Sequence, residues 1–169
     1  MLPKNLTSTS SILTVGDFTV ESGANTFTSN RVDLQLNPLD NEVMVIYAAN
    51  IDSRPPDLVS GVKTQTNVSI STTQRKDVGT IADANVIASQ VIECIYDGTA
   101  AVSFEHTAGE SPASALPYIG IIATNDFFVN IQGLGNLTAK TTSVRLWAVR
   151  AKPSSSVYAA LVQSELLSA

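Results

Sequence analysis

The side chains that could do chemistry are few and far apart in this sequence. His106 is the only histidine and Cys94 the only cysteine among 169 residues. Together they could form the base and nucleophile of a small hydrolase. An exposed histidine and a small buried thiol are the favoured interpretation, because no third group stands beside them. A metal-dependent cupin would need several histidine and glutamate ligands, so that class is excluded. We predict no catalytic residue, no metal site and no cofactor.

Two further stretches could hold a ligand. Asp52 and Asp57 bracket the segment "SRPP", and paired carboxylates on a loop can bind calcium, but the EF-hand spacing of oxygen ligands is absent. We predict instead a solvated turn with a contact to Arg54. The motif "GLGNLT" at 133–138 lacks the third glycine and the βαβ context of a dinucleotide-binding fingerprint. It is therefore predicted to be a loop that needs glycine for backbone freedom.

Trp147 is the only tryptophan, and it could serve as a platform for a sugar ring. Sugar-binding sandwiches often present an aromatic side chain in this way. Aromatic residues make up only 6% of the chain, however, so packing in the core or at an interface is the favoured role for Trp147. A carbohydrate-binding or adhesive module, such as a viral fibre head or a cell-surface domain, remains the alternative function.

Charge and hydropathy exclude several classes of protein. The net charge is -5 and the basic residues are scattered, so we expect no direct binding to nucleic acid. The first residues lack the apolar run of a secretory signal, and no segment approaches the roughly 20 apolar residues of a membrane span. Low charge with abundant serine, threonine and asparagine favours large neutral contacts between proteins.

Alternating apolar and polar residues indicate that most of the chain is β-structure. In 26–37, for example, Val32 and Leu34 alternate with Asp33 and Gln35. Many strands separated by short turns, without βαβ alternation, are typical of an antiparallel β-sandwich, and eight strands in two sheets would form a jelly roll. We expect strands over the following ranges: 12–20, 26–37, 42–51, 62–73, 100–106, 118–124, 127–133 and 141–151.

Two segments are predicted to be helical. One is a short internal helix, "DANVIASQVI" at 83–92, with Asp83 as its cap. The other is an amphipathic helix over 154–169, which follows Pro153 and belongs to the same domain as the sandwich at 12–153. Residues 1–11 are expected to form a flexible arm. The apolar side of the terminal helix needs a cover, either its own sandwich or a neighbouring subunit. The candidate interface therefore consists of Tyr158, Leu161, Val162, Leu166 and Trp147.

Three stretches together carry a resemblance to a known family: "SRPPDLVSGVKTQTNVSIS", "LPYIGIIATNDFFVNIQGLGN" and "VRLWAVRAKPSSSVYAALVQSE". Over residues 42–167 the chain resembles the small structural proteins of tailless icosahedral or environmental viruses, in which a single jelly roll is the capsid building block. The resemblance implies self-assembly into a shell, no catalysis, synthesis in the host cytoplasm without a signal peptide, and residence in the virion. The implied partners are copies of the chain and other virion proteins.

The chain departs from many genome-contacting coat proteins in one respect, because it carries no basic arm. For a capsid protein, this departure implies that the inner face meets a membrane, another protein layer or counterions.

Overall fold

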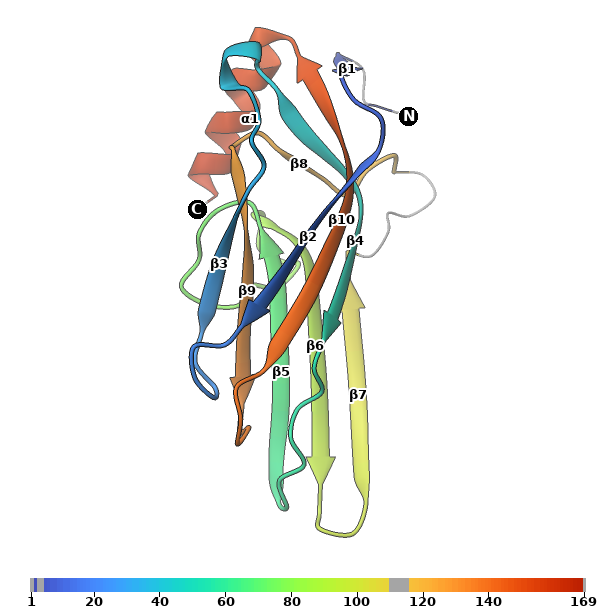
Figure 1. The fold of residues 1–169 in the computed structure, drawn as a ribbon, viewed down its shortest axis with the longest axis vertical. Helices are drawn as coiled ribbons and strands as arrows, with labels where there is room; N and C mark the ends of the chain where they lie inside the picture. Colours follow the sequence, from blue (N-terminus) through green and yellow to red (C-terminus); the bar gives the residue numbers. More distant parts are fainter. Residues whose placement is uncertain (1, 3–4, 110–115, 169) are drawn as a thin grey trace.

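A computed structural model describes residues 2, 5–109 and 116–168 of the chain. Two antiparallel sheets face each other in an elongated sandwich, and one helix lies at one end (Figure 1). The elements in chain order are β1 (Leu6–Ser8), β2 (Leu13–Val20), β3 (Thr28–Asp33), the 3-10 turn η1 (Pro38–Asp40), β4 (Val43–Ser53), β5 (Val62–Ser71), β6 (Val86–Tyr96), β7 (Ala101–Ala108), β8 (Gly120–Ile122), β9 (Asp126–Leu134), β10 (Thr141–Pro153) and α1 (Ser155–Leu167).

The strand order is that of a jelly roll. Sheet A contains β2, β10, β4 and β8 in this order, and β1 pairs with the far end of β10 on the same side as β2. Sheet B has the order β3-β9-β5-β6-β7. The pairs β2 with β10, β3 with β9, β4 with β8 and β5 with β6 are nested inside one another along the chain. A nested hairpin folded over on itself is a jelly roll, so the predicted fold class is confirmed.

The main core lies between the two sheets and is formed by alternate residues of their strands. Met44 and Ile46 on β4, Val68 and Ile70 on β5, and Phe127 on β9 are all essentially inaccessible to solvent. They point inward because alternate residues of a strand lie on one face of its sheet. Burying each such side chain contributes roughly 1.5–3 kcal/mol.

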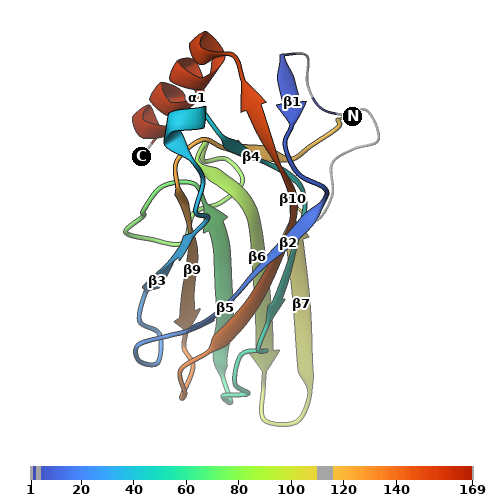
Figure 2. The ribbon, with the colours of Figure 1, turned by 45° about the horizontal axis from the view of Figure 1, so that its top comes forward.

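A second apolar cluster lies on the outer face of sheet A, under α1. Its buried members, here called the outer cluster, are Val43, Val45, Ala123, Val149 and Ala151. Residues of the main core alternate with them along β4 and β10, so these two strands are covered on both faces. The uninterrupted apolar run in 42–51 fits a strand that is covered on both faces. Figure 2 shows α1 beside the end of β10, where it covers this face.

The helix predicted over 83–92 is wrong, because residues 86–96 form β6. β6 pairs with β5 on one side and β7 on the other, and these ladders outweigh the local helical spacing of the apolar residues. Asp83 is not a helix cap. Its carboxylate accepts a hydrogen bond from the Thr80 N–H at 2.9 Å within the turn that precedes β6.

Part of the segment predicted as a flexible arm is a strand. Leu6, Thr7 and Ser8 form β1 and pair with Pro153, Lys152 and Ala151. Residues 1, 3 and 4 of the predicted arm, and residue 169 after the terminal helix, lie outside the described residues.

Candidate functional surfaces

The predicted interface residues of α1 divide into two groups. Tyr158, Leu161 and Val162 are half-buried and pack against the outer cluster, as the helical spacing predicts. Leu166 does not pack on the sandwich, since 62% of it is exposed. The helix is turned slightly from the predicted orientation, and the residue before Leu166 takes the buried position.

That residue is Glu165, whose carboxylate is buried. It accepts hydrogen bonds from the backbone N–H groups of Ala123 at 2.8 Å and Thr124 at 3.1 Å, and from the Thr124 hydroxyl at 2.8 Å. Burial raises the pKa of Glu165, and the negative charge of Asp126 acts in the same direction. Glu165 thus ties α1 to the turn between β8 and β9.

His106 and Cys94 are not brought together. Cys94 is buried on β6 opposite Ser103, whereas His106 is exposed on β7 opposite Val91. His106 lies three residues from Ser103, and an odd separation along a strand places two side chains on opposite faces of the sheet. Among the described residues, no group of three histidine, cysteine, aspartate or glutamate side chains could hold a metal ion.

The two aspartates that bracket "SRPP" have different environments, and the predicted contact with Arg54 is wrong for Asp57. Its carboxylate contacts the Lys140 ammonium at 2.5 Å and accepts the backbone N–H groups of Leu137 and Thr138. The Lys140 side chain holds the pKa of Asp57 at about 2, well below its usual value. The exposed Asp52 makes no side-chain hydrogen bond with another described residue.

Asp57 belongs to a group of polar side chains that joins three loops at the end of the sandwich opposite α1 (Figure 1). The carboxylate of Glu21, almost fully buried, accepts the N–H groups of Gly133 at 2.5 Å and Lys140 at 2.6 Å. Asn25 forms a pair of hydrogen bonds with the backbone of Asn136. We call Glu21, Asn25, Asp57, Asn136 and Lys140 the polar loop cluster. Of the predicted loop at 133–138, Gly133 and Leu134 are instead the end of β9, and these side chains hold the rest of the loop in place.

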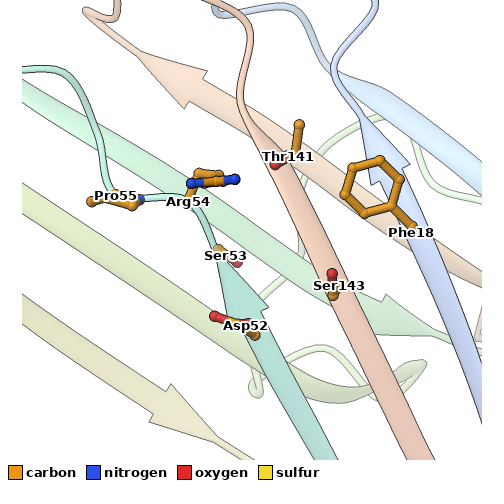
Figure 3. A pocket seen from close by; sticks show the side chains of 7 residues that line it. All are labelled: Phe18, Asp52, Ser53, Arg54, Pro55, Thr141 and Ser143. Atoms are coloured by element: carbon orange, nitrogen blue, oxygen red, sulfur yellow. The ribbon is translucent and has the colours of Figure 1, made fainter.

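A groove runs along the outer face of sheet A, on the strands next to this cluster. Figure 3 shows its centre, where Ser143 on β10 lies between Phe18 on β2 and Asp52 on β4. The small serine leaves a hollow of about 310 Å³ between its larger neighbours. The rest of the lining consists of Ser53, Arg54, Pro55 and Thr141. Because the groove draws on three strands that are distant in sequence, no sequence motif reveals it.

Trp147 lies further along the same face of β10 and is half-buried. The Arg145 guanidinium lies 6.0 Å from the centre of its ring, within the range of a cation–π contact. The structure thus places Trp147 on the outside of sheet A, away from the core between the sheets and from the buried outer cluster.

The second exposed surface is the free edge of sheet B. β7 is the last strand of this sheet, and six consecutive residues, 101–106, are exposed. Val102 and Phe104 are 52% and 59% exposed, and Ile95 on the neighbouring strand extends their apolar surface. No described strand pairs with the outer edge of β7. Its backbone groups on that side are therefore available to another strand.

Comparisons with known proteins leave the family open. No protein family profile matches the chain, and no curated protein sequence matches it. Among solved structures, it has a weak likeness to the tailspike protein gp49 of Acinetobacter baumannii bacteriophage Fri1, a capsular polysaccharide depolymerase. The TM-score is 0.18 and the identity 11%, over 70% of this chain and 19% of the tailspike. In the described part of this chain, no helix is long and apolar enough to cross a membrane.

Proposed function

We propose that this chain is a virion structural protein that assembles with copies of itself into a capsid shell. The single observation that carries the proposal is the free edge of β7, which is long, exposed and apolar on one face. A strand of this kind is a template for pairing with another chain, and monomeric proteins normally protect against it. The jelly-roll architecture is compatible with this role, since viral capsid domains share it.

The other sheet edges carry more of the features that prevent pairing with another chain than β7 does. β8 has only three residues, and β3 carries Arg31 and Asp33. On β2, the Asp17 side chain points toward the inside and receives two hydrogen bonds from Asn30 at 3.0 Å. Short strands, charges and inward-pointing carboxylates all prevent edge-to-edge association. β7 has eight residues and contains neither lysine nor proline. Its one carboxylate, Glu105, lies on the inner face of sheet B and accepts a hydrogen bond from the Gln90 side-chain amide at 2.7 Å.

The end of α1 offers a second contact surface for assembly. Leu166 and Leu167 are exposed beside the half-buried Tyr158 and Val162, and together they line a shallow apolar groove of about 580 Å³. Leu166 thus stays a candidate interface residue, although it does not pack on its own sandwich. Other virion proteins are possible occupants of this groove in the same shell.

Sedimentation velocity and negative-stain microscopy of the purified full chain, over a range of concentration, salt and pH, test the proposal. We expect closed shells, regular sheets or discrete oligomers that grow with concentration. A clean monomer at every concentration and condition would overturn the proposal.

The groove on sheet A favours a second candidate function, binding of carbohydrate. Phe18 offers an aromatic face, and the Asp52 carboxylate, the Arg54 guanidinium and nearby hydroxyl groups are free to form hydrogen bonds with a polyol. Titration of a panel of oligosaccharides by calorimetry tests this function. Binding that is lost in Phe18→Ala but kept in Phe104→Ala, a matched exposed phenylalanine on the other sheet, would support it.

A further inference from the structure

The sequence of β7 allows its outer edge to pair with the same edge of a second copy. We propose that β7 pairs antiparallel with β7 of a second copy around a two-fold axis through Phe104. The two copies of sheet B then join edge to edge into one continuous sheet. This inference rests on the proposed self-assembly and names the partner and the register of one of its contacts.

Symmetry restricts the registers that are possible. In an antiparallel pair, directly opposite residues lie on the same face of the sheet. A two-fold axis perpendicular to the sheet keeps each face on its own side, so one residue must lie opposite its own copy. Residues at equal distances before and after this central residue then form the other pairs. The longest overlaps of the eight-residue strand are centred on Phe104 or on Glu105.

Charge selects between these two centres. An axis through Glu105 would place two carboxylates directly opposite each other, which is destabilising. An axis through Phe104 places the two phenylalanines together, Ser103 opposite the partner's Glu105, and Val102 opposite the partner's His106. Aromatic pairs across strands are favourable, and the serine hydroxyl can donate a hydrogen bond to the carboxylate. The Phe104 register therefore has no clash between like charges.

The exposed apolar surface also favours this register. Val102 and Phe104 lie on the outer face of sheet B, and Ile95 on β6 lies directly opposite Val102. Pairing through Phe104 brings the two copies of this apolar patch together on the same face of the joined sheet. Removal of this patch from water adds to the backbone hydrogen bonds of the new ladder.

Cysteine cross-linking tests the register. In a Cys94→Ala background, which removes the native thiol, single substitutions Phe104→Cys, Ser103→Cys and Glu105→Cys are oxidised mildly and compared on a non-reducing gel. Opposite residues approach within about 4.5–5.5 Å, a separation that a disulfide can bridge, whereas residues one diagonal away lie about 7–8 Å apart. We expect Phe104→Cys to give a covalent dimer at least roughly tenfold faster than the other two.

A charge substitution gives an independent test with a matched control. Phe104→Lys should raise the dissociation constant of self-association roughly tenfold or more, because two ammonium groups would then face each other. Phe18→Lys, at an equally exposed phenylalanine on sheet A, should leave that constant unchanged.

The outcomes separate this inference from the proposed function. If the wild-type chain assembles but cross-links fastest at 103 or 105, or at none of the three positions, the register is overturned and self-assembly stands. Equal effects of Phe104→Lys and Phe18→Lys in an assembling chain also overturn it. If the wild-type chain stays monomeric, the proposed function itself fails.

Discussion

At one end of the sandwich the loops are joined by buried polar groups, whereas at the other end a helix covers an apolar surface. In the polar loop cluster, Glu21 and Asp57 each accept backbone N–H groups of residues 133–140, from the end of β9 to the start of β10. At the α1 end, most of the contact is between apolar side chains, and Glu165 makes the directional hydrogen bonds to the β8–β9 turn.

The difference shows two ways to fix a chain segment. Hydrogen bonds to a buried carboxylate specify individual backbone positions, and losing the carboxylate leaves several N–H groups unpaired at once. Apolar contact is not directional, so a shift of α1 over the outer cluster would break only the hydrogen bonds of Glu165. We therefore expect the loop end to be rigid and sensitive to single substitutions, and the helix end to tolerate them.

Removing the helix should have the largest effect. Deletion of 154–169 uncovers the outer cluster and should lower the free energy of unfolding by about 4 kcal/mol, from the loss of three half-buried side chains and of the Glu165 contacts. The main core is untouched, so the sandwich should stay folded but assemble poorly. Circular dichroism measures whether the truncated chain is folded, and light scattering measures whether it assembles. A fully unfolded product would show that the sandwich needs α1 in order to fold. Unchanged assembly would show that α1 does not contribute to the contacts between subunits.

A single substitution at the loop end should come next. Asp57→Ala leaves the Lys140 ammonium, whose side chain is only 7% exposed, without its carboxylate partner. We expect the free energy of unfolding in denaturant titrations to fall by about 3 kcal/mol. Asp52→Ala, at the exposed aspartate five residues earlier, is the matched control and should change stability by less than about 0.5 kcal/mol. Similar losses in the two variants would show that the Asp57–Lys140 ion pair makes no special contribution to stability.

The two ends should respond to pH in opposite directions. The pKa of Asp57 is lowered to about 2 from 3.8, so its stabilisation is present above 3.8 and is lost as the pH falls toward 2. The pKa of Glu165 is raised above 4.5, so its stabilisation is complete below 4.5 and is lost as the pH rises through the higher folded-state value.

Unfolding titrations between roughly pH 2 and pH 8 check the directions of these two dependences. Relative to wild type, Glu165→Gln should gain stability as the pH rises above 4.5. The disadvantage of Asp57→Asn should shrink as the pH falls below 3.8. Parallel pH profiles for the wild type and both variants would contradict the assigned shifts.

The smallest effect on stability should come from the exposed end of α1. Leu166→Ser should change the free energy of unfolding by less than about 0.5 kcal/mol, because the side chain is mostly in water. Leu161→Ala, at a half-buried position over the outer cluster, should cost about 1 kcal/mol or more. If Leu166→Ser impairs assembly while it leaves stability unchanged, Leu166 is a contact between subunits. Unchanged assembly would remove it from the interface.

The sandwich was predictable from the sequence because inward and outward residues alternate in most strands. β6 was not, because Val86, Ile87 and Val91 fit a helix and a strand equally well, and only pairing with β5 and β7 decides between them. On α1, adjacent residues differ by about 100° around the axis, so Glu165 falls between Leu161 and Val162 on the covered face and Leu166 falls at its margin. The groove and the polar loop cluster require strand register, which periodicity does not supply.

The nested strand order also has a consequence for biosynthesis. β10 lies between β4 and the strands β1 and β2, so sheet A lacks an inner strand until residues 141–153 have been made. Sheet B needs only β3, β5, β6, β7 and β9, which all precede it. We expect sheet B to fold first around the β5–β6 hairpin, while β2 and β4 wait for the last strand. Ribosomes that stall before residue 141 would therefore release a chain with the inner face of sheet B uncovered, a species prone to aggregation.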